Sequence, residues 1–355
     1  MHFIRNIGAP VALVCGVAQA TSREWSFVAD DAVVFESSAL PVQYSMSESQ
    51  LAQGLGSSFW TSSYVTGSNE HQYLILSHVL LSKYSGTATN TSITRFSVLD
   101  LTEPDDNYWA FTTAVTAPNT TLDTKLALNF EHVTFDGISS DSVSVMHTTG
   151  QTDGISYDIT WESSSAVIYN GGTGTFSFGP LPANQWSMPA GKTNGSLTLN
   201  GTEVLFDTTN SFTWYDRQWQ DSSPTLGNWT WFELHFQDPL IKASIWAIDE
   251  NTEPKNTSRF ASVRTPDGTH VLTYTLSPDY STTWYSSCSN ETYPLAWTLE
   301  FQNGEKLVAK SIRPDQELCG EVQIAYEGFV EVTGTVLGNE AAYGLVEIVD
   351  TRVSI

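Results

Sequence analysis

The sequence predicts an all-β protein built from two β-units, and three observations support this fold class. Segments of alternating apolar and polar residues recur along the chain, as in half-buried strands. Gly, Asn, Asp and Pro separate these segments, and helical periodicity is nearly absent. About 335 residues would remain after removal of a leader at 1–20, more than one core usually holds. Short strands at this spacing are typical of sandwiches or barrels.

Strand-like segments occur in both halves of the chain. The clearest are Tyr73 to Leu81, Ile155 to Trp161, Trp229 to Phe236, His270 to Leu276, Ala296 to Phe301 and Tyr343 to Val349. Prolines and small polar residues cluster from Gly179 to Gly195, a composition that disfavours a central strand. We therefore predict an N-terminal β-domain at 21–185 and a C-terminal β-domain at 186–355.

The N-terminus has the form of a secretory signal peptide at 1–20. Arg5 precedes an apolar run from Ile7 to Val17, and Ala18-Gln-Ala fits the small-x-small rule for cleavage. This run is too short to cross a bilayer, and no later segment has roughly 18 consecutive apolar residues. We expect cleavage before Thr21, a secreted or vesicular product and no membrane span. The alternative is a buried N-terminal strand.

Cysteine and asparagine usage fits the secretory pathway. Cys15 would leave with the signal peptide, and the remaining Cys288 and Cys319 are predicted to form one disulfide. Two separate buried thiols are the alternative. Several asparagines precede x-Ser/Thr without proline, as N-glycosylation requires. They are Asn90, Asn119, Asn194, Asn200, Asn228, Asn256 and Asn290. Asn228 lies within an aromatic strand pattern that would hinder its modification.

The charge of the chain excludes several partners. It has 15 basic and 39 acidic residues, a net charge of −24, which repels nucleic acid and anionic membranes. The acids are scattered singly, and we interpret them as a solubility feature. The histidines show no H-x-H or H-E-x-x-H spacing, so we expect no metal site. No G-x-S-x-G elbow or dinucleotide fingerprint occurs, which disfavours α/β-hydrolase and dinucleotide chemistry.

The densest aromatic segment reads F-T-W-Y-D-R-Q-W and starts at Phe212. In an extended chain, Phe212, Trp214, Asp216 and Gln218 share one face. A carboxyl group between aromatic walls is costly to ionise, so the pKa of Asp216 should rise, as a proton donor requires. Arg217 would face away or bend back to pair with an acid. A structural Asp216–Arg217 pair is therefore the alternative.

The next strand presents Trp229, Trp231, Glu233 and His235 on one face. Two indoles, an acid and an imidazole are an unusual set for a core or for a solvated face. They would suit a pocket for a flat apolar ligand. A surface strand with satisfied side chains is the alternative. Abundant tryptophan and acids also fit a carbohydrate-active β-protein, whose paired carboxylates cannot be located without the fold.

Several short motifs follow one another along the chain. They are G-T-G-T-F-S-F-G from Gly172, W-S-M-P from Trp186, W-Y-D-R-Q-W from Trp214, W-T-W from Trp229, Y-E-G-F-V-E-V from Tyr326 and Y-G-L-V-E from Tyr343. This succession resembles the fungal Diels–Alderase and kievitone hydratase group of the hydroxyneurosporene synthase-like superfamily. The match covers about the last 190 residues well and the first 150 loosely. One departure is Gln220-Asp221, where relatives usually place glycine.

The resemblance implies two lipocalin-like β-domains, a β-barrel or sandwich each, packed around a hydrophobic pocket without metal or redox cofactor. Members of the group hydrate or dehydrate prenyl-type alkenes, or steer cycloadditions of polyene and quinone-methide intermediates. The role of proton donor carries over to Asp216, with Trp214 as a cation-stabilising wall. The role of His235 does not carry over from a motif.

The leading hypothesis is a fungal secondary-metabolite cyclase of the hetero-Diels–Alderase type. It would form a quinone methide by dehydration and orient an alkene against it. The alternatives are a hydratase or dehydratase of prenylated phenolics, a lipocalin-like carrier, and a glycan-active protein. The predicted catalytic residues are Asp216, Trp214, Glu233 and His235. The predicted pocket residues are Phe212, Tyr215, Gln218, Trp229 and Trp231. The expected ligand is an apolar small molecule, without a cofactor.

Overall fold

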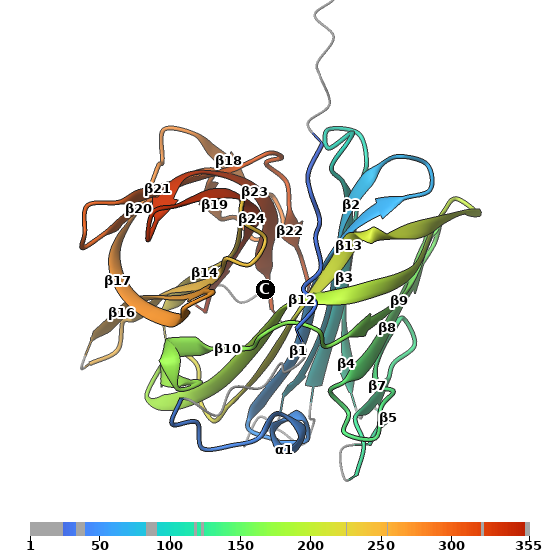
Figure 1. The fold of residues 1–355 in the computed structure, drawn as a ribbon, viewed down its shortest axis with the longest axis horizontal. Coiled ribbons are helices and arrows are strands. Elements are labelled where there is room, and N and C mark those ends of the chain that lie inside the picture. The colour runs from blue at the N-terminus through green and yellow to red at the C-terminus, as the bar shows by residue number, and fades with distance from the viewer. Residues whose placement is uncertain are drawn as a thin grey trace, which may run out of the picture.

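The computed structural model describes residues 24–32, 40–82, 91–116, 119–121, 124–224, 226–253, 255–320 and 323–351. Of the described residues, 64% lie in strands and 3% are helical, which confirms the all-β prediction. Figure 1 shows a closed barrel beside a curled half-barrel sheet. The predicted signal peptide at 1–20 and Thr21 lie outside the described residues.

The first sheet is antiparallel and has the strand order β4-β3-β2-β1-β13-β12-β9-β8-β7-β6-β5, with β10 and β11 paired to β12. Its strands are β1 (Gly56–Gly67), β2 (Gln72–Ser82), β3 (Thr91–Asp100), β4 (Tyr108–Thr116), β5 (Asn119–Thr121), β6 (Ala127–Asn129), β7 (Val133–Gly137), β8 (Val145–Thr152), β9 (Ile155–Glu162), β10 (Ile168–Tyr169), β11 (Thr175–Phe178), β12 (Leu181–Leu199) and β13 (Thr202–Gln220). Two helical segments accompany it, α1 (Met46–Gln50) and a 3-10 turn (Asn170–Gly172).

The second sheet closes into a barrel because β21 pairs with both β20 and β23. Its strands are β14 (Asn228–Phe236), β15 (Lys242–Glu250), β16 (Asn256–Thr265), β17 (Gly268–Pro278), β20 (Ala296–Phe301), β21 (Lys306–Ser311), β22 (Glu317–Leu318), β23 (Ala325–Val336) and β24 (Asn339–Asp350). A separate hairpin joins β18 (Thr283–Tyr285) to β19 (Thr292–Pro294). Closure pairs strands that would otherwise be open edges.

The division between the sheets falls between β13 and β14, later in the chain than the predicted break at 185/186. Residues 186–220 pair with β1 and β9 and therefore belong to the N-terminal β-domain. The proline-rich segment forms a strand because its register with β13 shifts between Met188 and Gly191. Pro189 lies at this irregularity, where no regular ladder bond is lost.

The buried apolar side chains of the described residues form three clusters, and strand alternation decides which cluster each side chain enters. Tyr215 on β13 packs within the curled sheet, and Phe232 on β14 packs within the barrel. Their neighbours Trp214 and Trp231 point the other way, into a third cluster between the two domains. Residues 24–32 run along this interdomain interface (Figure 1, dark blue) and add Trp25 to the cluster.

Cys288 and Cys319 form a disulfide with a Cα–Cα distance of 6.5 Å, which confirms the predicted pairing. Among the sequons, Asn194, Asn200, Asn256 and Asn290 are exposed, and Asn228 is half-buried. Asn119 lies in β5, and Asn90 lies outside the described residues. Glycosylation at these positions remains a prediction.

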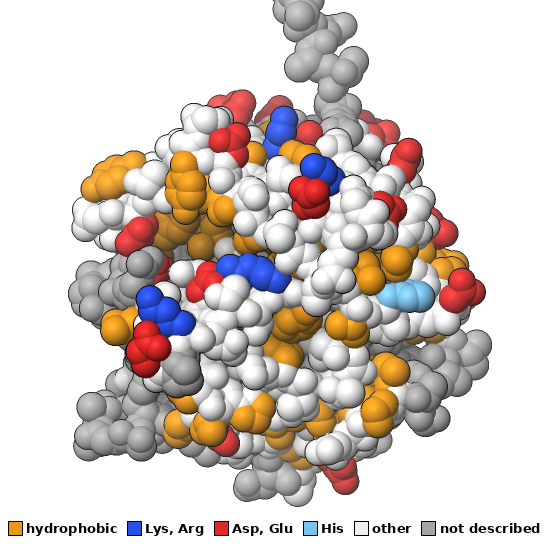
Figure 2. All heavy atoms as spheres, turned by 90° about the vertical axis from the view of Figure 1, so that its left-hand side faces the viewer, with side chains coloured by type: hydrophobic (Ala, Val, Ile, Leu, Met, Phe, Trp, Pro, Cys, Tyr) orange, Lys and Arg blue, Asp and Glu red, His pale blue; other side chains and the backbone are white. Residues whose placement is uncertain are grey.

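The molecular surface agrees with the interpretation of scattered acids. On the face shown in Figure 2, acidic side chains are dispersed among polar and apolar ones and do not gather into one patch. In the part of the chain that the structure describes, no helix is long and apolar enough to cross a membrane.

Candidate active site

The register of the first sheet aligns one row of side chains on its interdomain face. Arg95 on β3 lies opposite His78 on β2, and His78 lies opposite Trp60 on β1. Trp60 in turn lies opposite Asp216 on β13. Because directly opposed residues share a face of a sheet, the four side chains form a continuous row.

The barrel presents a second row against the first. Trp231 on β14 lies between Trp246 on β15 and Glu347 on β24, and Glu347 lies opposite Glu327 on β23. The Trp60 ring meets the Trp231 ring edge to face, with a centroid distance of 5.2 Å. The Trp60 indole N–H also donates to Glu327 Oε2 at 2.9 Å. The two domains therefore contact each other through aromatic and polar groups.

A cavity lies between these rows. Its lining residues are Ser58, Trp60, His78, Leu80, Arg95, Phe178, Gln185, Asp216, Gln218, Gln220, Trp229, Trp231, Trp246, Gln323 and Glu347. Its empty volume is about 550 Å³, which includes the open solvent at its mouth. Small-molecule sites usually combine apolar walls with a few placed polar groups. The lining of this interdomain cavity, several indole rings with a few acids and amides, suits a flat apolar ligand.

Asp216 is the acid that the sequence predicted at such a site. Its side chain lines the interdomain cavity, and the residue is only 4% exposed. Gln185 Nε2 donates to Asp216 Oδ2 at 3.2 Å, whereas Asp216 Oδ1 has no hydrogen-bond partner among the described residues. Burial raises the pKa of Asp216 to about 7, because water no longer stabilises the carboxylate. A proton on Asp216 is therefore available near neutral pH.

Glu347 is a second acid in the same cavity, and the sequence did not single it out as catalytic. Trp229 Nε1 donates to Glu347 Oε1 at 2.7 Å, and Arg95 Nη2 lies 3.6 Å from Glu347 Oε2. Burial and repulsion by Glu327 raise the pKa of Glu347 to about 8. Arg95 is held more closely by Glu327, at 2.6 Å, so it does not keep Glu347 ionised.

His78 is held as a neutral imidazole beside these acids. Arg95 Nε donates to His78 Nδ1 at 2.9 Å, so the ring proton lies on Nε2 and donates to Ser58 Oγ, also at 2.9 Å. Burial and the neighbouring Arg95 charge lower the pKa of His78 well below its usual range. Ser58 accepts this bond and keeps its own hydroxyl proton for a ligand or a water in the cavity.

The structure separates the predicted residues into layers along the strands. Of the predicted residues, Asp216, Gln218, Trp229 and Trp231 line the interdomain cavity. The remaining residues of the predicted interdomain face are Trp214, Glu233, Phe212 and His235. These lie behind the cavity wall, in the core between the domains. The cavity therefore occupies only part of the face predicted from β13 and β14, because both strands extend beyond it.

The layer behind the cavity is polar but sealed. Ser62 donates to Glu233 Oε2 at 2.6 Å, and His235 Nε2 hydrogen-bonds Glu233 Oε1 at 2.7 Å. Burial raises the pKa of Glu233 and lowers that of His235, so both groups favour their neutral forms. Glu233 and His235, predicted as catalytic residues, lie in this enclosed layer and do not line the interdomain cavity.

Tyr215 and Arg217 lie on the opposite face of β13. The Tyr215 hydroxyl donates to Gln50 Oε1 at 2.8 Å within the curled sheet, so Tyr215 does not line the cavity as predicted. Arg217 donates to the carbonyl oxygens of Ser58 and Gln218, at 3.2 and 2.5 Å. Of the two directions left open for Arg217, the structure has the one that faces away from Asp216, so the alternative of an Asp216–Arg217 pair is wrong.

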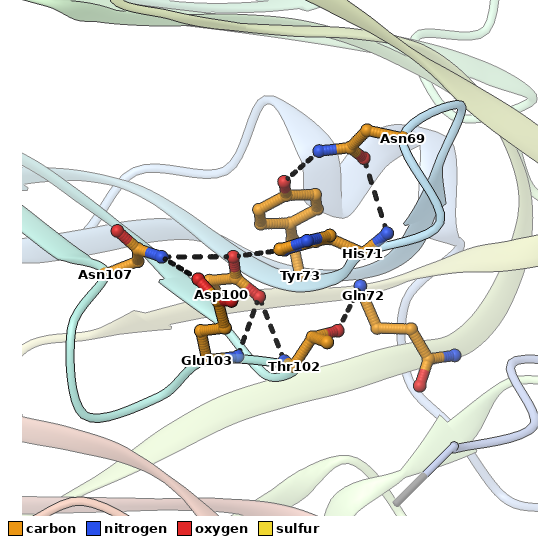
Figure 3. A network of polar contacts seen from close by, with 8 residues as sticks. All are labelled: Asn69, His71, Gln72, Tyr73, Asp100, Thr102, Glu103 and Asn107. Carbon is orange, nitrogen blue, oxygen red and sulfur yellow. Dashed lines mark hydrogen bonds and ion pairs between the residues drawn. The ribbon is translucent and has the colours of Figure 1, made fainter. Parts of the chain in front are cut away.

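A cluster with metal-ligand residue types lies outside the cavity (Figure 3). His71 Nδ1 lies 2.7 Å from Asp100 Oδ2, and Glu103 lies close by. Asp100 Oδ1 accepts the backbone N–H groups of Thr102 and Glu103, at 2.9 and 3.2 Å. Because these N–H donors already engage the carboxylate, we assign the cluster to the β3–β4 turn rather than to metal binding.

Fold and site together define a two-domain β-protein with an acid-bearing hydrophobic cavity. The chain belongs to the AttH-like family, whose model matches residues 89–350. Kievitone hydratase from Fusarium solani subsp. phaseoli is 37% identical over 348 residues, which cover 97% of this chain and 96% of that protein. Dehydratase asqC from Emericella nidulans is 33% identical over 323 residues, covering 87% and 89%.

Solved structures agree with these relationships. The crystal structure of kievitone hydratase from Nectria haematococca matches with a TM-score of 0.82 and 33% identity, over 92% of this chain and 99% of that chain. The structure of CghA with Sch210972 matches with a TM-score of 0.54 over 92% and 96% of the two chains. Because only 12% of the residues are identical, this match shows a shared fold and no more. The predicted membership of the kievitone hydratase group is confirmed.

Proposed function

We propose that this protein is a cofactor-independent hydro-lyase of secondary metabolism that adds water to, or removes it from, an apolar phenolic substrate. The observation that carries the proposal is Asp216, a buried acid with one free oxygen in a cavity walled by tryptophans. Two relatives that match most of the chain bear the names hydratase and dehydratase, which supports the same reaction class.

The two cavity acids provide a route for both protons of the reaction. In hydration, Asp216 gives its proton to an alkene carbon, and the cation forms on the neighbouring carbon. The faces of Trp60 and Trp231 would stabilise that cation. Water then adds through its oxygen, and its excess proton passes to Glu347 in those molecules in which Glu347 is ionised and Asp216 is protonated. In dehydration the roles reverse: Glu347 protonates the leaving hydroxyl, and Asp216 takes the proton from carbon.

Cyclisation by the same site is the second candidate function. Loss of water from a hydroxymethyl phenol would leave a quinone methide between the aromatic walls. A cavity flanked by Trp229, Trp231 and Trp246 on one side and Trp60 on the other would hold such a flat intermediate against an alkene. Confinement of two reacting partners lowers the entropic part of the barrier.

Product analysis in oxygen-18 water tests both functions with a prenylated phenol and an alkenyl hydroxymethyl phenol. Label in a new tertiary alcohol, formed only with the protein, supports the hydro-lyase. An unlabelled cyclic ether of one stereochemistry supports the cyclase. If the same racemic mixture forms with and without protein, both enzyme functions are wrong, and the lipocalin-like carrier becomes the better account.

We also propose that the protein follows the secretory pathway and is glycosylated. The support is the leader-like sequence at 1–20, the exposed Asn194, Asn200, Asn256 and Asn290, and the disulfide. Intact mass of the native protein, before and after deglycosylation, is the test. We expect a chain that starts near Thr21 and loses glycan mass. An unglycosylated product that retains Met1 would contradict this route.

A further inference from the structure

A second cavity lies at another part of the interdomain interface. Its lining residues are Glu24, Trp25, Ser26, Val28, Phe236, Gln237, Pro239, Lys242, Ala342 and Tyr343, and its empty volume is about 820 Å³, open solvent included. Along β14, Trp231 lines the first cavity, whereas Phe236 lines the second. Glu233 and His235 lie between these positions, and Lys242 is the register partner of His235. We call this second space the Lys242 cavity.

Lys242 is the unusual residue of this cavity. It is only 2% exposed, yet it lines the cavity, and its Nζ lies 5.2 Å from the centroid of the Phe212 ring. No hydrogen bond or ion pair joins Lys242 Nζ to any residue in the part of the chain that the structure describes. A buried ammonium that lacks a hydrogen bond or ion pair is costly, so burial favours the neutral amine.

The nearby carboxylates already have partners. Asp30 lies 2.8 Å from Arg264 Nη2, and Arg264 is the register partner of Lys242 on β16. Glu233 accepts from Ser62 and hydrogen-bonds His235. Burial lowers the pKa of Lys242 to about 7, and the Arg264 charge adds to this effect. The charges of Asp30, Glu233 and Asp238 act in the opposite direction without outweighing burial. Near neutral pH, a large fraction of Lys242 is therefore a free amine with an available lone pair.

We propose that Lys242 is a carbonyl-reactive amine and that the Lys242 cavity takes a small apolar aldehyde or ketone as a reversible imine. The Lys242 nitrogen attacks the carbonyl carbon, and the resulting carbinolamine loses one water to give the C=N bond. The aromatic rings of Trp25 and Tyr343 provide an apolar wall for the carbonyl compound. The net charge of −24 opposes entry of an anion, which favours a neutral carbonyl ligand over a carboxylate.

Reductive trapping with benzaldehyde and cyanoborohydride tests this proposal in the full-length protein, and peptide mapping locates the adduct. At a pH slightly above 7, we expect Lys242 to be modified roughly tenfold or more faster than exposed Lys310, because an ordinary lysine stays protonated there. The trapping rate at Lys242 should rise through a pH of about 7. Equal labelling of the exposed lysines, or labelling of all but Lys242, would overturn the proposal.

Three variants test whether the amine of Lys242, and not another group in the cavity, forms the adduct. Lys242→Met removes the amine, Lys242→Arg keeps a cation that forms no imine, and Lys310→Met is the matched control. We expect both Lys242 variants to lose the fast adduct and Lys310→Met to retain it. Benzoate that protects Lys242 better than benzyl alcohol, without any aldehyde adduct, would instead show an anion site and refute the imine. Trapping requires no turnover, so its outcome does not depend on the proposed hydro-lyase.

Discussion

At the residue scale, Asp216→Asn is the most direct test of the catalytic proposal. The variant keeps the size and the Gln185 contact of the side chain but can no longer exchange a proton. We expect turnover to fall by roughly 100- to 10,000-fold, with ligand affinity retained. Turnover, ligand binding and melting temperature should be measured together.

Stability against pH provides the control for that variant. Because folding raises the pKa of Asp216 to about 7, the folded state holds a proton that the unfolded chain releases at lower pH. The stabilising contribution of this carboxyl is therefore present in acid and is lost as the pH rises through about 7. Above that pH, Asp216→Asn should melt at the same or a higher temperature. A variant that unfolds would show that Asp216 is structural.

The pH dependence of turnover tests the pairing of Asp216 with Glu347. The proposed reaction needs one protonated and one ionised carboxyl, and their pKa values are about 7 and about 8. We expect kcat to peak between these values and to fall on both sides. Glu347→Gln should abolish the bell shape. A wild-type rate that falls only once, with rising pH, would mean that a single acid suffices.

The residue scale also shows what the sequence could reveal of the site. Asp216 was predictable because its aromatic neighbours occupy alternate positions on the same strand. Glu347, His78 and Arg95 carry no such local signal. His78 and Arg95 reach the cavity because β1, which carries β2 and β3 beside it, pairs with the distant β13. Glu347 reaches it because β24 pairs with the distant β14. Local alternation shows which side chains share one face of a strand, but it does not show which other strands form the opposite wall of the cavity.

At the scale of the element, β14 offers two adjacent aromatic residues with opposite roles. Phe232 lies inside the barrel and Trp231 in the interdomain cavity. We expect Phe232→Ala to destabilise the fold by about 3–5 kcal/mol. Trp231→Phe should change the melting temperature little but slow turnover roughly five- to thirtyfold, through a weaker cation–π interaction. Thermal melts and kcat for both variants check the contrast; equal effects on turnover would contradict it.

The same element shows the limit of pattern reading. The alternation on β14 correctly placed Trp229, Trp231, Glu233 and His235 on one face. It did not show where along that face the open cavity ends and the core begins. That depends on how the neighbouring domain packs, where Ser62 donates to Glu233 and the Trp214 ring packs against His235.

At the scale of the whole molecule, the Cys288–Cys319 disulfide is expected to stabilise the folded protein against unfolding. The two cysteines are separated by 31 positions, so the chain-entropy estimate for the closed loop is about 3–4 kcal/mol. We expect Cys288→Ser with Cys319→Ser to lower the midpoint of chemical unfolding and to raise the slope, because the unfolded chain is no longer held in a loop. The single variant Cys288→Ser also lacks the bond and should lower the midpoint by a similar amount. An unchanged midpoint would show that the bond adds no stability.

Two β-units were predictable at this scale from strand spacing and length. The boundary between them was not, because Pro182 and Pro189 suggested a linker where the structure has β12. The pairing of β21 with β23 likewise has no signature in either strand alone. Closure and domain boundary both depend on partners far away in sequence.

The location of the acids on different domains has a consequence for how the protein would fail. Asp216 belongs to the curled sheet and Glu347 to the barrel, so neither half carries a complete proton relay. A small shift of one domain against the other would separate the two acids and stop turnover, although both domains would remain folded. On gradual heating or with mild denaturant, inactivation should therefore precede the loss of β-structure.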